Sequence, residues 1–258
     1  MLCDGNVTQV TLITRYSFAE LLTHFWSVMR RLTLVLPAVV VALATWSAGA
    51  SASSAKTAAE ILQLSVGSMR VAGSFHYTST SSIGGKEALS LSTDSSLKDG
   101  VQIQKLDGGT ETTLLIGKKL YMKANAKAYA QDFGVKKSTL ANKWVLIPTT
   151  NKNYSNVAEA ILVPSVMQEL VDIGSITNAG EVTIDGQSAI ALKGNAGASG
   201  IEYIYVSLKK PYLPLGVSAQ ATEDGKKLTN ELVFSKWGEK FKVSAPSTYV
   251  VATNKTFP

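Results

Sequence analysis

Polar and apolar positions over residues 57–73 follow the period of an α-helix. Thr57 and Glu60 stand three positions apart, as in a capping box, and Gly73 supplies a common helix stop. Between them, small and apolar residues recur at i, i+3, i+4, i+7, i+8 and i+11: Ala58, Ile61, Leu62, Ser65, Val66 and Met69. The pattern predicts an amphipathic helix whose apolar stripe packs against another layer of the protein.

Alternation with a period of two follows this helix. Short segments of this kind, separated by turn residues, occupy 74–82, 88–92, 101–104, 113–116 and 120–123. Gly84 and Gly85 mark one turn, and Gly117 with its two lysines marks another. Strands of this length at such regular spacing predict an antiparallel meander.

The middle of the chain returns to a helical pattern. Residues 125–133 have helical composition and are followed by Gly134, and residues 143–148 read as a short buried strand that ends at Pro148. Two further helical segments, 157–162 and 164–173, come next. In the second one, four apolar residues share a face: Val166, Met167, Leu170 and Val171.

The last third of the chain is typical of hairpins. Residues 181–184 and 188–192 flank Asp185 and Gly186, a strong signal for a two-residue turn. A strand over 201–208 and a hairpin of 212–221 with 227–237 follow, and 241–243 reads as a last short strand. No internal repeat, low-complexity stretch or linker interrupts the pattern.

These elements predict an α+β fold with ten or eleven antiparallel strands and a few helical pieces. The simplest arrangement is one strongly curved sheet, an unclosed β-barrel, with the apolar stripes of the helices laid on its concave face. We expect residues 53–258 to form this single domain.

The segment before the domain has the three parts of a secretory signal peptide over residues 29–52. Arg30 and Arg31 follow Met29, an uncharged apolar run covers 32–46, and Ala50-Ser51-Ala52 or Ala48-Gly49-Ala50 offers a cleavage site. A retained membrane anchor is the alternative, but fifteen residues make a helix of about 22 Å against a hydrocarbon core of roughly 30 Å. Residues 1–28 fit no targeting pattern, so we interpret them as an upstream extension from a mis-assigned start codon.

Composition narrows the chemistry of the exported part. Its sequence has no cysteine, since Cys3 precedes the signal peptide, and it therefore lacks both a disulfide and a lipobox for a lipid anchor. Residues 53–258 hold 22 Lys and Arg against 17 Asp and Glu, and Arg70 is their sole arginine. This argues against nucleic-acid binding, which favours arginine, and favours weak attraction to anionic surfaces of the cell envelope.

Candidate catalytic residues are scarce. His76 is the sole histidine of the exported part, and no G-x-S-x-G motif or cluster of metal ligands accompanies it. The sequence therefore predicts neither an enzyme nor a metal or cofactor site. Lys209 with Lys210, and Lys226 with Lys227, flank hairpins, where solvated charge is the usual role and contact with anionic lipid headgroups is the alternative.

The order of the elements resembles the LolA/LolB-like lipoprotein-carrier fold, and in particular the LppX/LprA/LprF/LprG group of bacterial envelope lipid-binding proteins. The similarity covers most of residues 54–250 and is carried by short pieces in a shared order: 58–62 leading to 73–76, 117–122, 143–145, 182–187, 205–215 and 234–246. The resemblance implies an unclosed barrel with lid helices and an apolar cavity for acyl chains. Many members carry a lipidated cysteine, which this chain lacks, so it is expected to be a soluble, diffusible monomer of the periplasm or cell envelope.

This resemblance turns the apolar alternation into a hypothesis about ligand binding. If the alternation points inward, eleven residues line a cavity between sheet and lid: Leu89, Leu91, Val101, Ile103, Leu114, Ile116, Leu120, Met122, Val166, Met167 and Leu170. The competing interpretation is a solid core at ordinary density, which the sequence does not separate from a cavity. The expected partners are lipid or glycolipid acyl chains, with transient contact to a membrane surface or envelope proteins. The alternative function is an envelope sensor or protein-binding module without lipid transport.

Overall fold

The computed structural model describes residues 56–133, 139–171, 173–195, 200–223 and 225–253. The predicted upstream extension, 1–28, and the predicted signal peptide, 29–52, lie outside the described residues.

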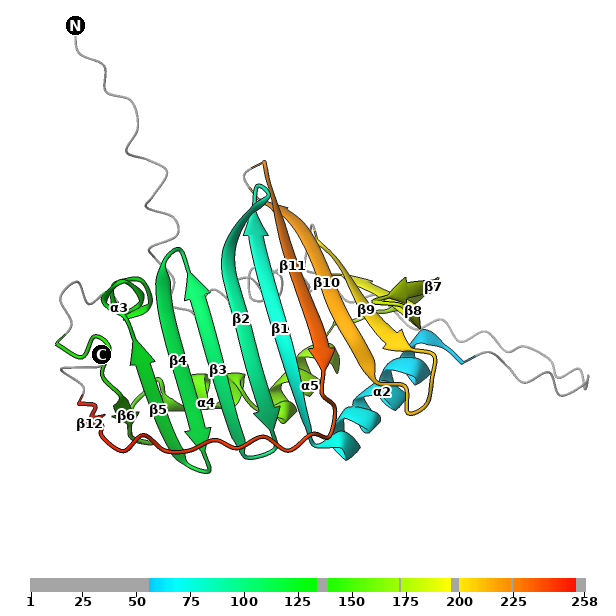
Figure 1. Cartoon of the computed structure of the whole chain (residues 1–258). Helices are drawn as coiled ribbons and strands as arrows, with labels where there is room; N and C mark the ends of the chain where they lie inside the picture. Colours follow the sequence, from blue (N-terminus) through cyan, green and yellow to red (C-terminus); the bar gives the residue numbers. More distant parts are fainter. Residues whose placement is uncertain (1–55, 134–138, 172, 196–199, 224, 254–258) are drawn as a thin grey trace, which may run out of the picture.

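A single sheet of twelve strands forms the body of the protein (Figure 1). Its order is β12-β6-β5-β4-β3-β2-β1-β11-β10-β9-β8-β7, so the first strand lies near the middle and the two edges are β12 and β7. The strands are β1 (Ser74–Ile83), β2 (Lys86–Ser96), β3 (Asp99–Leu106), β4 (Gly109–Ile116), β5 (Lys119–Ala124), β6 (Val145–Ile147), β7 (Thr177–Ile184), β8 (Gln187–Asn195), β9 (Ile201–Ser207), β10 (Pro214–Glu223), β11 (Lys226–Ser235) and β12 (Val250–Val251). The predicted α+β fold with one unclosed, curved sheet is confirmed.

Pairing is antiparallel between all neighbours except β12 and β6, which run parallel. The expected last strand at 241–243 is wrong: these residues belong to no strand, and the final strand among the described residues is β12. Pro246 follows this segment and has no amide hydrogen to donate to a neighbouring strand. The chain also has to cross from β11 to the far edge of the sheet before it pairs with another strand, β6. The predicted turn at Asp185 and Gly186 is confirmed, with φ of 49° and 75° as a type I′ turn requires.

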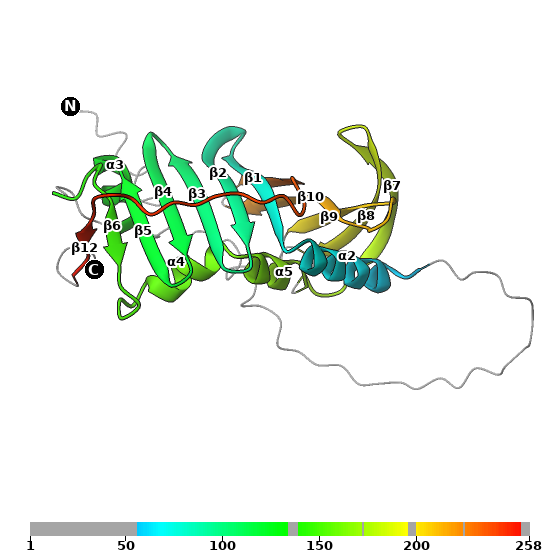
Figure 2. The same cartoon turned by 60° about the horizontal axis from the view of Figure 1, so that its bottom comes forward.

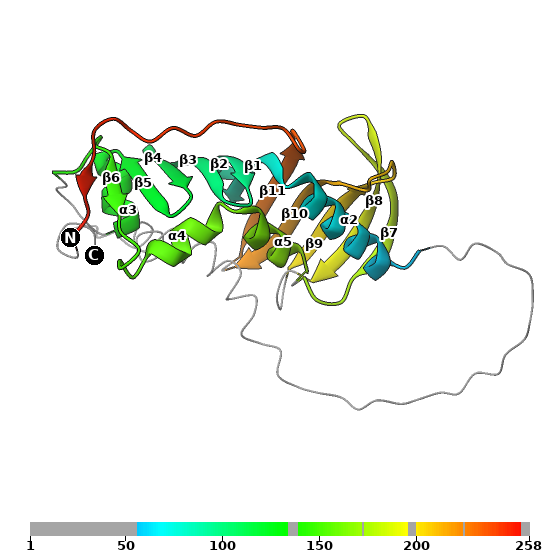
Figure 3. The same cartoon turned by 90° about the horizontal axis from the view of Figure 1, so that it is seen from below.

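Four helices of the described residues lie on one side of the sheet: α2 (Ala58–Ala72), α3 (Ala126–Phe133), α4 (Tyr154–Ala160) and α5 (Val163–Val171). Figures 2 and 3 show α2, α5 and α4 in a row inside the curve of the sheet. The capping box of α2 is formed, since the Glu60 amide donates to Thr57 Oγ1 at 3.2 Å and the Thr57 amide donates to Glu60 Oε2 at 2.7 Å. We call these helices the lid.

Two apolar clusters join lid and sheet. The larger one holds α2 and α5 on β1, β8, β9 and β11, with Met69, Phe75 and Ile204 at its centre, each at most 1% exposed. The second holds α3 and α4 on β4, β5 and β6 around Leu120, Met122 and Ile161. Described side chains therefore fill the space between these helices and the strands beneath them.

The corner between α4 and α5 is anchored by a close approach to the sheet. The carbonyl of Ile161 accepts a hydrogen bond from Ser95 Oγ at 2.9 Å. Directly beneath it lies Gly100, where an added Cβ would stand 2.9 Å from the same carbonyl oxygen. A glycine is therefore needed on β3 for the corner to sit this close.

The C-terminal segment crosses the convex side of the sheet, opposite the lid (Figures 1 and 2). It starts where the Gly238 amide donates to the Ser74 carbonyl at 2.9 Å, and Ser74 Oγ donates to the carbonyl of Glu239. At its far end Tyr249 packs edge-on against Tyr121 with ring centroids 5.4 Å apart. Both faces of the sheet thus have apolar partners.

Candidate functional site

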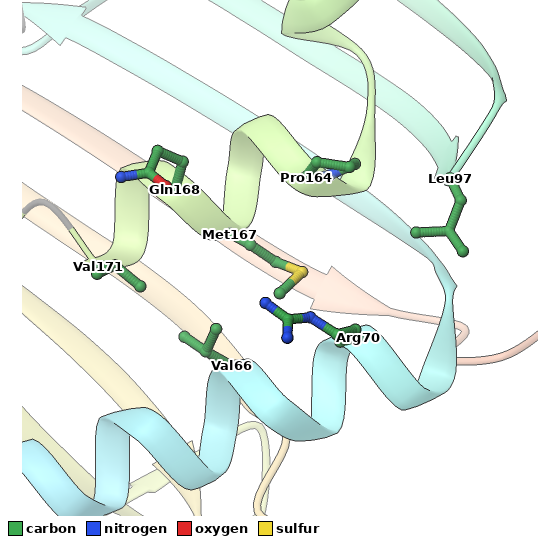
Figure 4. A pocket seen from close by; sticks show the side chains of 7 residues that line it. All are labelled: Val66, Arg70, Leu97, Pro164, Met167, Gln168 and Val171. Atoms are coloured by element: carbon green, nitrogen blue, oxygen red, sulfur yellow. The ribbon is translucent and has the colours of Figure 1, made fainter.

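A groove between α2 and α5 is the candidate site (Figure 4). Its volume is about 240 Å³, and its lining is mostly apolar. The lining residues come from both helices and from the turn after β2: Val66, Arg70, Leu97, Pro164, Met167, Gln168 and Val171.

The helical repeat explains why these residues meet. Val66 and Arg70 are four residues apart on α2, and so are Met167 and Val171 on α5, so each pair forms one ridge of its helix. Figure 4 shows Met167 reaching from α5 toward α2 between Val66 and Arg70. Methionine is unbranched and adaptable, so this wall of the groove can change shape at low cost.

Arg70 is the one cation in the lining, and it is exposed. Within the described part of the chain, no carboxylate forms an ion pair with it; the ion pairs seen there join His76 to Asp94 and Lys127 to Asp107. Its place in the last turn of α2 complements the helix dipole. The guanidinium is therefore available to an anionic group at the end of an apolar groove.

Two of the apolar side chains that line the groove are exposed to solvent. Leu97 is 51% exposed and Val171 38%. Such residues are common singly, but here they gather around one opening, which favours a role in binding.

The sheet surface behind the lid carries a buried polar band between the two apolar clusters. Gln102 Nε2 donates to Thr93 Oγ1 at 3.2 Å and to the Tyr77 hydroxyl at 3.4 Å, and Thr113 Oγ1 donates to Glu111 Oε1 at 2.9 Å. Higher on the same face, Leu89, Leu91 and Leu106 form a third cluster made of strand residues alone. The concave face is therefore patterned in polar and apolar zones and is not uniformly apolar.

Glu202 on β9 is a buried acid of this face. It is 3% exposed, and its neighbours across the ladder are the small residues Gly194 and Ala219, with Ile173 packed over Gly194. Burial raises the pKa of Glu202 to about 7, and the negative charge of Glu169 on α5 adds to the increase. The carboxyl is consequently close to half-protonated at neutral pH.

The structure divides the predicted ligand residues between two faces. Seven lie on the concave face or on α5: Leu89, Leu91, Leu120, Met122, Val166, Met167 and Leu170. Four lie on the convex face: Val101, Ile103, Leu114 and Ile116. Each of them is next in sequence to a residue whose side chain points to the concave face, and successive side chains of a strand point to opposite faces. For these four the expected inward orientation is wrong, since the polar Gln102 and Gln104 take the inward positions of β3.

Met167 is the one predicted residue that also lines the groove. Sequence reasoning missed Arg70, Leu97 and Val171 as lining residues, although Arg70 carried a signal as the sole arginine of residues 53–258. Leu97 had no usable signal, because an apolar residue in a turn is ordinary until its neighbours are known.

The remaining candidate chemistry lies away from the groove. His76 Nδ1 and Asp94 Oδ1 are 2.8 Å apart as a cross-strand pair of β1 and β2. Across the ranges that the structure describes, no three His, Cys, Asp or Glu side chains gather as metal ligands. No helix in those ranges is long and apolar enough to span a membrane.

Comparison with solved structures finds several distantly similar proteins. LppX of Mycobacterium tuberculosis, described as a lipoprotein, is 14% identical with a TM-score of 0.48, over 71% of this chain and 96% of that one. LprF of Mycobacterium bovis is 13% identical with a TM-score of 0.49, over 74% and 97% of the two chains. MucB is 13% identical with a TM-score of 0.42, over 76% and 65%.

The sequence matches no known family profile, and no curated protein is similar to it. At identities of 13–14% and TM-scores below 0.5, the likeness to these solved structures says nothing about the function of this chain.

Proposed function

We propose that this protein binds and carries a lipid or another acylated molecule outside the cytoplasm, and that it does so without chemical transformation. The observation that carries the proposal is the α2–α5 groove, which is mostly apolar and has the Arg70 guanidinium available at one end. This pairing suits an acyl chain with an anionic headgroup. The predicted signal peptide supports a place in the envelope or periplasm.

Burial of the chain supplies the affinity. Each methylene withdrawn from water contributes about 0.8 kcal/mol, so a micromolar affinity, which needs about 8 kcal/mol, requires burial of roughly ten or more of them. Apolar walls provide this without fine selectivity, and Arg70 adds a preference for a phosphate or carboxylate near the helix end.

The size of the groove indicates how a longer chain would enter. About 240 Å³ is below the roughly 300–1,000 Å³ of most small-molecule sites. Val66 and Met167 are both under 8% exposed and close the floor between the helices. A full acyl chain therefore requires α2 and α5 to move apart, which would open a path from the groove toward the concave sheet.

Substitution of Val171 by glutamate is expected to weaken binding of a fluorescent fatty acid at least tenfold, because a carboxylate enters the apolar groove and repels the anionic headgroup. The measurement is displacement titration in solution. Val233→Glu is the matched control, since Val233 is 40% exposed against 38% for Val171 but lies on the convex face of β11. Equal affinities for the two variants would contradict the proposed site.

Arg70→Met tests the headgroup contact separately. We expect a several-fold loss of affinity for a fatty acid and little change for the corresponding fatty alcohol, because methionine keeps the apolar stem and removes the charge.

Native mass spectrometry of protein from its own host should show a co-purified lipid. A lipid-free mass together with capture of a protein partner that is insensitive to delipidation would favour the alternative, a protein-binding module.

A further inference from the structure

Four segments that are distant in the sequence come together at one end of the strands, across the middle of the sheet and not at its edge strands β7 and β12. They are the last turn of α2, the β2–β3 turn at 97–99, the β9–β10 connection at 208–212, and residues 236–240 after β11; Figure 1 shows them along its lower edge. The Ser68 hydroxyl of α2 donates to the Pro211 carbonyl, and the Gly238 amide donates to the Ser74 carbonyl just after α2. We call this the groove edge, because Arg70 and Leu97 of the groove belong to it.

The groove edge is strongly basic. Six cations in these segments are exposed: Arg70, Lys98, Lys209, Lys210, Lys236 and Lys240. The same segments hold two acids, Asp99 and Glu239, and the Asp99 carboxylate accepts a hydrogen bond from the Gly117 amide at 2.7 Å. The net charge of these short segments is +4 (6 − 2), whereas the net charge of the whole chain is +6. Most of the excess positive charge is therefore concentrated here.

Apolar side chains stand among these cations. Val71 is 89% exposed, Leu97 51% and Leu208 37%, and each belongs to a different segment of the groove edge. Lysines around exposed aliphatic side chains are the pattern of surfaces that rest on anionic lipid, where the charges meet headgroups and the apolar tips enter the interface.

At the opposite end of the strands, the lysines of the described residues stand next to acids. There Lys127 pairs with Asp107 at 3.2 Å, Lys86 is followed by Glu87, and Lys226, which precedes Lys227, lies opposite Glu223 in the β10–β11 hairpin. The asymmetry between the two ends gives the molecule a preferred orientation near a negatively charged surface.

We infer that the groove edge docks on the surface of an anionic lipid bilayer. This inference rests on the proposed function, because an acyl chain must leave or enter a membrane to be carried. The docked orientation turns the mouth of the groove, with Arg70 and Leu97, toward the headgroups. An acyl chain then passes between bilayer and groove with little exposure to water.

The test is co-sedimentation of the protein with vesicles of phosphatidylcholine alone or with phosphatidylglycerol added. Binding is expected to the anionic vesicles, to be weak on phosphatidylcholine, and to fall steeply in 0.5 M salt because ionic screening shortens the reach of the charges. The double variant K209E/K210E should bind anionic vesicles at least tenfold more weakly. K226E/K227E is the matched control, since it reverses a lysine pair at the opposite end of β10, and its binding should be unchanged.

A second pair of variants tests the apolar contribution. Leu97→Glu should reduce vesicle binding, whereas Ile103→Glu, which changes a residue 45% exposed on the convex face, should not. Equal vesicle binding by K209E/K210E and K226E/K227E overturns the inference, whatever the groove does. Failure of the wild-type protein to bind the fluorescent fatty acid in solution overturns the proposed function instead, and K209E/K210E should keep that solution affinity.

Discussion

Replacement of Glu202 by glutamine is expected to raise the free energy of unfolding by about 3 kcal/mol at pH 8 and to leave it nearly unchanged at pH 4. The cause is the burial of this carboxyl on β9, next to the negative charge of Glu169, which raises its pKa from 4.5 to about 7. Glutamine has nearly the same shape as the protonated acid and cannot ionise, so the cost of a buried charge disappears.

The sign follows from proton binding in the two states. Between pH 4.5 and about 7 the folded protein holds a proton on Glu202 that the unfolded chain releases, so wild-type stability falls as the pH rises through this window and then levels off. Denaturant unfolding at several pH values measures this slope. Glu231→Gln, at an exposed carboxyl on β11, serves as the control and should retain the wild-type slope. A Glu202→Gln protein with an undiminished slope would show that another group causes the pH dependence.

Gly100→Ala is expected to cost about 2 kcal/mol of stability, because the new methyl group would lie 2.9 Å from the Ile161 carbonyl oxygen and 3.3 Å from that of Asp94. Both obstacles are backbone atoms, so relief requires the corner between α4 and α5 to lift from β3. The hydrogen bond from Ser95 to the same carbonyl would then lengthen. We expect faster hydrogen exchange in α5 as well as a lower unfolding midpoint.

Gly67→Ala provides the matched control for this prediction. Gly67 lies within α2 with nothing within 4 Å of the position of its added Cβ, so alanine there should stabilise the protein by roughly 0.5–1 kcal/mol. Both variants replace glycine by alanine, and the changes that they cause in the free energy of unfolding are expected to have opposite signs. Stabilisation of the protein by Gly100→Ala would contradict the tight seating of the lid corner.

Local signals were sufficient for most elements of the fold. The capping box at Thr57, the stripe of α2 and the turn at Asp185 depend on residues within a few positions of one another, so their physics is contained in the sequence. The order of hairpins likewise restricted the fold to one curved sheet, because consecutive strands joined by short turns pair with each other.

The face that each strand turns to the lid was decided only by the tertiary structure. Val101 and Ile103 were expected inside by their hydrophobicity, yet Gln102 and Gln104 are inside. The C-terminal segment packs on the convex face, where Tyr249 contacts Tyr121. Hydrophobic residues are therefore needed on both faces of the sheet. Alternation along a strand consequently does not identify which face is the concave one.

The sequence by itself determined the elements, their order and the absence of a cysteine after the predicted signal peptide. The tertiary structure alone placed Arg70 beside Met167 and Leu97, in a groove between two helices that are almost a hundred residues apart. It also gathered the lysines of three separate segments at one edge. Hydrogen-bonding pattern and helical period act over a few residues, whereas a groove and a charged edge depend on where distant segments meet, and that is fixed only when the helices pack on the sheet.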